Sequence, residues 1–248
     1  FVFHLSLGTP GRRALLGTDG EGRTHVRLEV GRPLGLVARM AAGWASILAP
    51  GRVQVLLPDG REVRGSAPVP PAGHLAPAGP PRVLYHCFGG AHTSVVAGAL
   101  HLGLLPTMPS WRQIAAFPLF DRTPTRERGS PIFLGIDEQG RQVFAMGRGR
   151  NHRSMLHVLQ SLLEVLGAAD SVVAYDTLSC AGLLTKLGGY MSRRLGLVRP
   201  GRALAAMGVR RDLPRLQAVV DRARNHGGPA IMAAGDPDHA GKRDSYPG

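Results

Sequence analysis

The sequence predicts an α/β protein with a three-layer, doubly wound, Rossmann-like domain, a mostly parallel sheet and a β-hairpin insertion. Three observations predict this class. Short apolar or β-branched runs alternate with longer segments of helical periodicity, which is the pattern of β–α–β units. A glycine-bearing turn joins one of these strands directly to a helix. Hydrophobic residues make up 44% of the 248 positions, which is enough for a substantial core.

An internal repeat divides the chain. Residues 16–23 (LGTDGEGR) match residues 134–141 (LGIDEQGR) at an offset of 118 positions, 134 minus 16. Each match is followed by an apolar helical stretch and then a short apolar strand, which indicates a duplicated domain. The first copy lacks the opening strand and glycine loop of the second. We therefore predict a truncated copy at 1–66, a Pro-rich linker at 67–81, an intact domain at 82–225 and a disordered tail at 226–248.

The intact domain is expected to alternate strands and helices. Helices are predicted where apolar residues recur every three or four positions, and strands where short β-branched or aromatic runs lie between turn residues. In chain order the predicted elements are a strand at 83–87, a helix at 92–102, a helix opened by a capping box at 110–117, a hairpin of 132–136 with 142–146, a helix at 151–166, a strand at 171–175, helical segments through 195, a strand at 203–207 and a helix capped by Asp212.

Composition and charge narrow the function classes. The net charge of +13 favours an anionic partner, although coding bias in a GC-rich genome would give the same arginine-rich composition. No apolar run approaches the roughly 18 residues of a membrane helix, and no signal peptide is evident. With only Cys87 and Cys180, neither a disulfide framework nor a zinc cluster is expected. A cytoplasmic protein without metal or cofactor is the simplest prediction.

The strongest candidate site is the segment 85–94 (YHCFGGAHTS), where a strand runs through a loop into a helix. Gly89 and Gly90 allow a tight turn that exposes backbone N–H groups, and the helix N-terminus adds partial positive charge. Thr93 and Ser94 place hydroxyl groups in the first helical turn. These features predict a binding loop for a phosphate or carboxylate group. The alternative is a simple strand-to-helix turn without a ligand.

Two side chains of this loop could take part in chemistry. The same local charge should lower the pKa of the Cys87 thiol and favour the thiolate, which could accept a phosphoryl or acyl group. His92 is the candidate acid or base. Alternatively, Cys87 is a small buried hydrophobic residue. His86, His92 and His101 do not have the spacing of a metal site, and His101 is expected to be a surface or packing residue.

Further candidates lie at the predicted C-terminal ends of other strands. Asp176 could orient a polar ligand, His86 or His92, but such a residue more often caps the next helix. Cys180 could pair with an oxidised Cys87 or be inert. Arg193 and Arg194 follow a Gly-Gly pair and could bind an anion through their guanidinium groups. They could equally form a solvated basic face after a helix break.

Two kinds of resemblance extend this interpretation. The spacing Cys87-x-x-Gly90-x-x-Thr93-Ser94 resembles the phosphocysteine loop of sugar phosphotransferase IIB components and the loop of low-molecular-weight tyrosine phosphatases. Those phosphatases have an essential Arg where Thr93 stands, which argues against phosphatase activity. Residues 83–224 resemble the domain of unknown function 3189 family of Gram-positive bacteria, through the motifs YHCFGGAHTS (85–94), HLGLLP (101–106), FD (120–121), GIDEQG (135–140), LGGYMSRRLG (187–196) and GR (201–202). The resemblance implies a bacterial cytoplasmic protein and no known catalytic residues.

Three hypotheses follow for function. The first is a site that binds a small phosphorylated or carboxylated ligand, with Cys87 as a possible phosphoryl or acyl acceptor. The second is a non-catalytic module that binds nucleic acid or an acidic protein, although aromatic residues do not alternate with the arginines as a stacking surface would require. The third is a structural role in which the truncated first copy docks on the intact domain.

Overall fold

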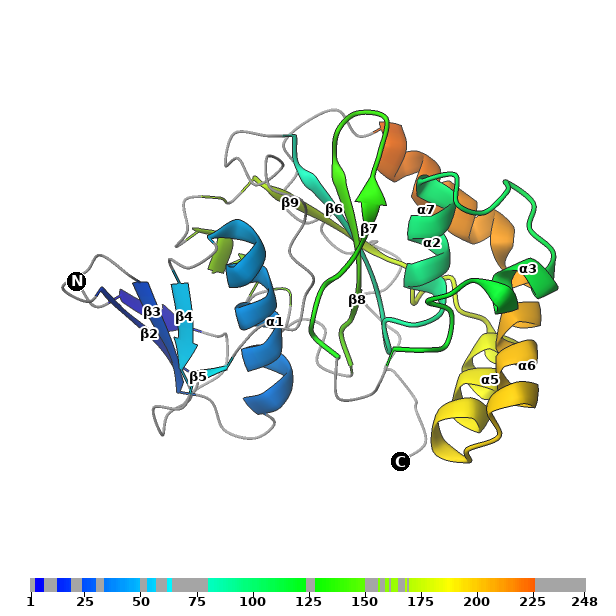
Figure 1. The fold of residues 1–248 in the computed structure, drawn as a ribbon, viewed down its shortest axis with the longest axis horizontal. Helices are drawn as coiled ribbons and strands as arrows, with labels where there is room; N and C mark the ends of the chain where they lie inside the picture. Colours follow the sequence, from blue (N-terminus) through cyan, green and yellow to red (C-terminus); the bar gives the residue numbers. More distant parts are fainter. Residues whose placement is uncertain are drawn as a thin grey trace.

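The structure is a computed structural model (Figure 1). It describes residues 3–6, 13–18, 24–29, 34–49, 53–56, 62–63, 80–123, 128–149 and 170–225, with residues 156, 159, 160, 162–164 and 168. Most of the predicted linker, 67–79, and the whole of the predicted tail, 226–248, lie outside the described residues.

The N-terminal part forms a five-stranded sheet whose strands follow chain order. Strands β1 to β3 are antiparallel neighbours, β3 and β4 are parallel, and β5 is antiparallel to β4. Helix α1 (Leu34–Leu48) connects β3 to β4. The strands are β1 (Phe3–Ser6), β2 (Arg13–Thr18), β3 (Thr24–Glu29), β4 (Val53–Leu56) and β5 (Glu62–Val63).

A second sheet of four strands carries the candidate site. Its order is β7-β8-β6-β9, with β7 antiparallel to β8 and with both β8 and β9 parallel to β6. The strands are β6 (Arg82–Cys87), β7 (Ile132–Ile136), β8 (Gln142–Gly147) and β9 (Val172–Asp176). The mixed α/β class and the β7–β8 hairpin are therefore confirmed, while the finer three-layer, Rossmann-like class stays a prediction.

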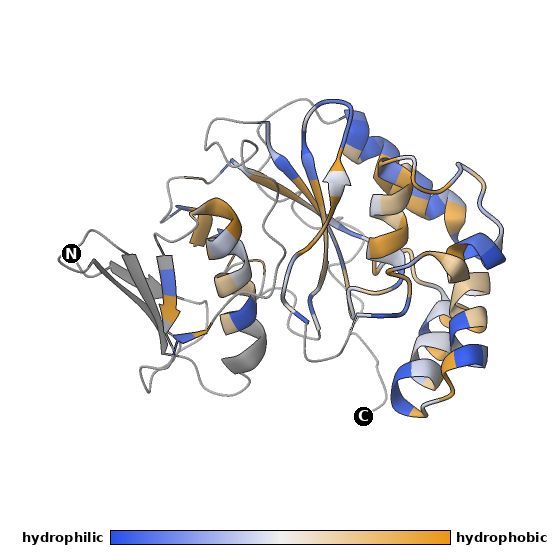
Figure 2. Cartoon of the chain, in the orientation of Figure 1, coloured by the Kyte–Doolittle hydropathy of each residue, from blue (hydrophilic) through white to orange (hydrophobic). Residues whose placement is uncertain are grey.

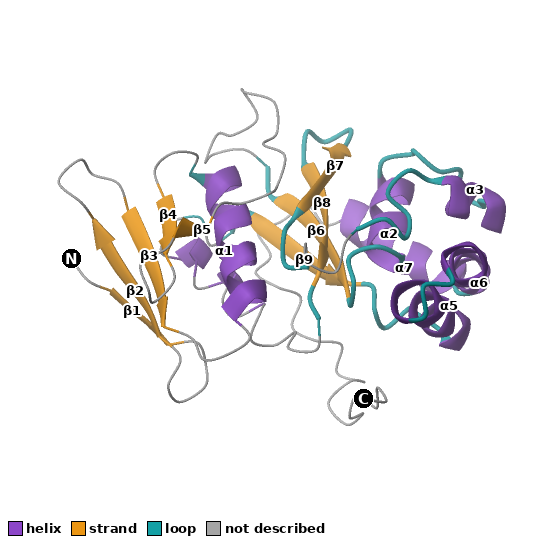
Figure 3. Ribbon diagram, turned by 60° about the horizontal axis from the view of Figure 1, so that its bottom comes forward, coloured by secondary structure: helices purple, strands orange, loops and turns teal. Residues whose placement is uncertain are grey.

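Five helices of the described residues belong to this part of the chain: α2 (Thr93–His101), α3 (Trp111–Ala116), α5 (Leu183–Arg194), α6 (Val198–Arg211) and α7 (Leu213–Asn225). Figure 3 shows them on one side of the four-stranded sheet and α1 on the other. The predicted capping box is present, because Ser110 and Gln113 bond reciprocally at the start of α3. Within the described residues, every helix is too short or too polar to traverse a lipid bilayer.

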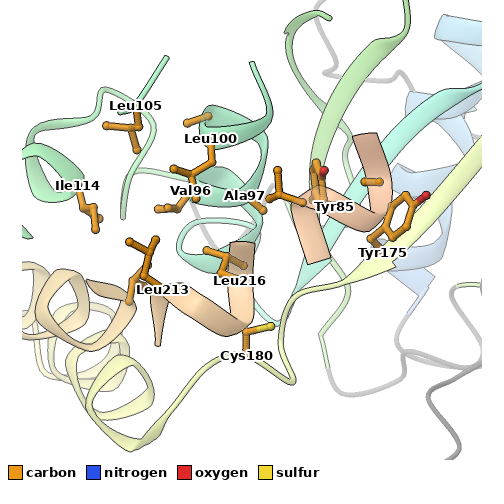
Figure 4. Close-up of a cluster of buried hydrophobic side chains, with 14 of the residues drawn as sticks. Tyr85, Val96, Ala97, Leu100, Leu105, Ile114, Tyr175, Cys180, Leu213 and Leu216 are labelled. Atoms are coloured by element: carbon orange, nitrogen blue, oxygen red, sulfur yellow. The ribbon is translucent and has the colours of Figure 1, made fainter. Parts of the chain in front are cut away.

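Alternating residues of β6 bury both faces of the sheet. Val83 and Tyr85 join an apolar cluster with residues of α2, α6 and α7, whereas Leu84 joins a cluster that contains α1. Figure 4 shows the first cluster, and in Figure 2 the ribbons of β6, β8 and α2 include stretches coloured as hydrophobic. In the second cluster the ring centroids of Trp44 in α1 and Phe144 in β8 lie 5.3 Å apart. Helix α1 thus packs directly on the second sheet.

One predicted element is wrong. Residues 203–207 were expected to form a strand, but they lie in the middle of α6. Burial of Gly201, Ala205, Ala206, Gly208 and Val209 follows a helical spacing. An apolar run of five residues has no periodicity that separates a buried strand from a buried helix, and the alanines favour the helix.

Helices α5 and α6 pack at backbone contact, which explains the Gly-Gly pair. Gly188 lies inside the continuous helix α5, so of the two alternatives for this segment the helix break does not occur. A Cβ atom on Gly188 would lie 2.3 Å from the backbone nitrogen of Ala205. The side chain of Asp212 accepts a hydrogen bond from the amide of Gly182 at 2.8 Å, so its carboxylate bonds the N-cap residue of α5.

A buried polar network joins β6, α2 and the hairpin turn. The Nε2 atom of His101 donates to the carboxylate of Asp137 at 3.0 Å, and its Nδ1 atom accepts from the Tyr85 hydroxyl at 2.6 Å. Burial lowers the pKa of His101, although Asp137 opposes this shift. His101 is therefore an interior residue and packs within the fold, which excludes the surface alternative.

We expect Tyr85→Phe to lower the free energy of unfolding by about 1–3 kcal/mol, because it leaves the buried Nδ1 atom of His101 without a donor. Urea denaturation measures this difference. Tyr190→Phe is the matched control, since Tyr190 is 53% exposed and a surface hydroxyl should change stability by less than about 0.5 kcal/mol. Equal effects of the two substitutions would contradict a role for the network.

The repeat has counterparts among the described strands. Adding 118 positions to β3 (24–29) gives 142–147, the bounds of β8, and adding 118 to β2 (13–18) gives 131–136, which contains β7. Both pairs are antiparallel hairpins. The sheets also differ: β6 lies between β8 and β9 whereas β3 pairs directly with β4, and the first sheet has the additional strands β1 and β5 at its edges. The duplication itself stays a prediction.

Candidate functional site

The chain turns tightly from the last residue of β6 into the first turn of α2, at the C-terminal ends of the parallel strands. We call this segment, residues 87–94, the cysteine loop. Gly90 has φ of +71°, a conformation that favours glycine. The loop packs against the end of β8, because a Cβ atom on Gly90 would lie 2.5 Å from the nitrogen of Gly147. A Cβ atom on Gly89 would meet nothing within 4 Å, so the loop has open space beside Gly89.

The sulfur of Cys87 is the group that the cysteine loop surrounds. The amide of Gly90 donates to Sγ at 3.2 Å, and the hydroxyl of Ser94 lies 3.1 Å from it. The residue is only 3% exposed. Burial raises the pKa of the Cys87 thiol, but hydrogen bonds from the Ser94 hydroxyl and from the amides of Ser94, His92 and Gly90 outweigh it and lower the pKa overall. The loop therefore stabilises a thiolate.

This arrangement differs from the expectation of a loop with free amides. The sequence led us to expect that the amides would bind an external anion, but they converge on the protein's own sulfur. A nest of N–H groups stabilises any negative charge placed in it, and the group that this nest surrounds is the Cys87 sulfur. An external anion would have to bind beside the sulfur, and further positive charge would have to attract it there.

Cys180 provides the opposite environment. It lies in the apolar cluster with Tyr175 and Leu216 (Figure 4). Burial raises the pKa of its thiol to about 11. These surroundings make Cys180 the less reactive of the two cysteines.

Asp121 is the residue of this region that sequence reasoning missed. Its carboxylate is fully buried and accepts hydrogen bonds from Nε2 of His92 at 2.9 Å, from the hydroxyl of Ser192 at 2.5 Å and from Nε of Arg193 at 3.0 Å. Arg202 approaches it at 3.8 Å. Burial raises the pKa of Asp121, but the hydrogen bonds and positive charges prevail and lower it. The FD motif at 120–121 was the only sequence signal for this residue.

The other predicted residues are placed as follows. His92 is the N-cap residue of α2, and its ring is hydrogen-bonded to Asp121. The ring also packs against Gly189, where an added Cβ atom would lie 2.8 Å from it. Thr93 is buried, and its hydroxyl accepts from Thr177 at 3.2 Å. Only Ser94 of the two predicted hydroxyl residues contacts the sulfur among the described interactions.

The predicted counter-charges have different environments. Arg193 bonds the Asp121 carboxylate and the carbonyl of Thr123, whereas Arg194 is exposed. Asp176 accepts from the amide of Leu178 at 2.8 Å, as an Asx turn does, and lies 3.4 Å from Arg148. Asp176 therefore closes a turn and does not cap the next helix, since the N-cap residue of α5 is Gly182. The Oδ1 atom of Asp176 lies 3.7 Å from Nδ1 of His86.

Two further contacts tie this region to the cysteine loop. Thr123 donates its hydroxyl to the carbonyl of Gly90 at 3.1 Å. The guanidinium of Arg128 stands over the ring of Phe88 at 4.9 Å from its centroid. Within the part of the chain that the structure describes, no group of three or more His, Cys, Asp or Glu side chains is arranged to hold a metal ion.

The fold and this site define an α/β domain with a thiolate-stabilising loop between a central parallel strand and a helix. A family model described as "Protein of unknown function (DUF3189)" matches residues 82–225, and the chain belongs to this family. No curated protein and no solved structure matches the chain.

Proposed function

We propose that the domain binds a small phosphorylated ligand beside the cysteine loop, with Cys87 as a nucleophile that accepts the phosphoryl group. The observation that carries this proposal is the environment of the sulfur. Donors from Gly90 and Ser94 stabilise a thiolate in a residue that is almost fully buried. A cysteine whose pKa is lowered is a better nucleophile at neutral pH, because a larger fraction of it is thiolate.

The proposed step is a displacement at phosphorus. The Cys87 thiolate attacks the phosphorus atom and forms an S–P bond, while the bond between phosphorus and the ester oxygen of the ligand breaks. That oxygen leaves with the bonding electron pair and takes a proton, for which we propose His92, whose side chain is 16% exposed. The open space beside Gly89 is the proposed side of approach. Transfer to water or to a second acceptor would restore the thiolate.

The pair of cysteines permits an internal comparison of thiol reactivity. We expect iodoacetamide to alkylate Cys87 at neutral pH much faster than Cys180, because the pKa of Cys87 is lowered and that of Cys180 is raised to about 11. Peptide mass spectrometry of the native protein across a pH series measures both rates. Ser94→Ala should raise the pH at which Cys87 becomes reactive, since it removes one donor to the sulfur.

Phosphoryl transfer is tested on the same protein with acetyl phosphate and para-nitrophenyl phosphate as probes. We expect a mass increase of one phosphoryl group on wild-type protein and none on Cys87→Ser, with Cys180→Ser as the matched control. A Cys87 thiol that is unreactive in the native protein toward both iodoacetamide and acetyl phosphate would overturn the proposal.

We also propose that residues 1–66 are a truncated copy of the domain in a bacterial, cytoplasmic protein. The coincidence of β2 and β3 with β7 and β8 at one offset supports the duplication. The resemblance to a family of Gram-positive bacteria and the use of only two cysteines, both free, support the setting.

A further inference from the structure

More positive charge surrounds the cysteine loop than the nearby acidic groups neutralise. Arg128 lies on the loop itself, because its guanidinium covers the ring of Phe88, the residue that follows Cys87. The next residue, Gly129, donates its amide to the carbonyl of Gly147 at 2.9 Å. Since Gly147 is the β8 residue paired with Cys87, the backbone at Arg128 is anchored beside the cysteine.

Arg193 and Arg202 are linked to the loop through Asp121, which also bonds His92, and Arg193 is linked to it through Thr123 as well. Arg193 uses Nε for the Asp121 carboxylate and Nη1 for the carbonyl of Thr123. Among the described residues, its Nη2 atom is buried without a hydrogen-bond partner, and so is Nε of Arg202, which lies 3.8 Å from the Asp121 carboxylate. Buried guanidinium N–H groups normally have an acceptor, and an anion bound at this position would supply one.

The charges of this region do not balance. Among the described residues, Arg193 and Arg202 pair with one carboxylate, on Asp121, while Arg128 and Arg194 lie nearby, and the proposed function adds one further negative charge, the Cys87 thiolate. Four positive and two negative charges leave a surplus of two. Asp176 does not reduce this surplus, because it pairs with Arg148.

The guanidinium groups are also close enough to repel one another. Burial lowers the pKa of Arg128, and the charges of Arg193 and Arg194 lower it further. Like charges held together at a partly buried site destabilise the free protein, and an anion placed between them removes that repulsion.

We propose that Arg128 and the Nη2 group of Arg193 bind the phosphate of a dianionic phosphomonoester against the cysteine loop. This inference rests on the proposed function and names its ligand class. A dianion compensates the surplus of two charges, whereas a phosphodiester or a carboxylate supplies only one. The guanidinium groups also offset the repulsion between the ligand and the Cys87 thiolate, which the loop amides cannot do while they bind the sulfur.

Phosphate-dependent thermal unfolding of the full chain tests this inference. Inorganic phosphate should raise the midpoint temperature of the wild type relative to chloride at equal ionic strength, because a ligand of the native state stabilises it. Acetate, a monoanion, should have a smaller effect. For Arg128→Met the phosphate concentration that gives the same rise should increase about tenfold or more, as expected when a charge-assisted hydrogen bond is lost.

Arg112→Ala is the matched control. Arg112 also stacks on an aromatic ring, that of Trp111 at 5.0 Å, but in α3 and outside the cysteine loop, so its loss should leave the phosphate response unchanged. If the wild type responds and Arg128→Met responds equally, the role of Arg128 is overturned and the proposed function stands. If the wild type shows no response beyond that to chloride, phosphate binding fails and both proposals fall. A similar decrease in Arg112→Ala would mean a general surface-charge effect and would also overturn the inference.

Discussion

Replacing Gly90 with alanine is expected to lower the free energy of unfolding by about 3 kcal/mol, the sum of two separate effects. The first is conformational, because Gly90 has φ of +71° and an L-residue with a side chain is strained there by about 1–2 kcal/mol. The second is steric, because the new Cβ atom would lie 2.5 Å from the nitrogen of Gly147 and 3.0 Å from its Cα. Neither atom can move without shifting β8. Urea denaturation of the two proteins measures the difference.

Gly89→Ala is the control for this substitution, one residue earlier in the same loop. Gly89 does not have a positive φ, and its added Cβ atom would meet nothing within 4 Å. We expect a change of at most about 1 kcal/mol, with stabilisation favoured because the unfolded chain loses freedom. If the two alanine variants are equally stable, the described contact between the cysteine loop and β8 is not what holds the loop.

The parts of the fold that were predictable from the sequence are those determined by neighbours in the chain. The capping box at Ser110, the hairpin turn after Ile136 and the strand-loop-helix around Cys87 each depend on residues a few positions apart. Helix α6 was missed because its apolar run of five residues fits a strand equally well. Neither a capping box nor hydrophobic periodicity contains information on the packing of α6 against α5. That packing decides here between a helix and a strand.

The site was harder to predict, for two physical reasons. Asp121 contacts His92, Ser192 and Arg193 across sequence separations of 29, 71 and 72 residues, and no local pattern encodes such contacts. The role of the loop amides was also ambiguous, since an N–H nest binds an internal thiolate as well as an external anion. The residue types alone could identify the loop but not which negative charge occupies it.

Asp121 holds the cysteine loop to the helical hairpin of α5 and α6. We therefore expect Asp121→Asn to lower the free energy of unfolding by about 3–5 kcal/mol, as is usual when one partner of a buried ion pair is removed. Asparagine is the informative substitution because Asp121 has φ of 56°, a conformation that asparagine adopts about as readily as aspartate. The variant therefore changes the charge and little else. The guanidinium group of Arg193 and the ring N–H of His92 would lose the negative charge of the acceptor that they share.

The same carboxylate should make stability depend on pH in the acid range. The pKa of Asp121 is lowered in the folded protein, so its contribution is fully present above the unfolded value of about 3.9. That contribution is lost as the pH falls below this value and through the folded pKa. Urea denaturation at a series of pH values should show this loss of stability in the wild type. In Asp121→Asn the stability should fall less over the same pH range.

Asp221→Asn separates this effect from the general loss of one negative charge. Asp221 lies on the exposed surface of α7, and removing its charge should leave both the stability at neutral pH and the acid dependence close to those of the wild type. Since the carboxylate of Asp121 also contacts the N-cap residue of α2, Asp121→Asn should further slow alkylation of Cys87 by loosening the amides that stabilise its thiolate. A variant as stable as Asp221→Asn, with wild-type reactivity at Cys87, would show that the buried carboxylate neither holds the hairpin nor positions the cysteine loop.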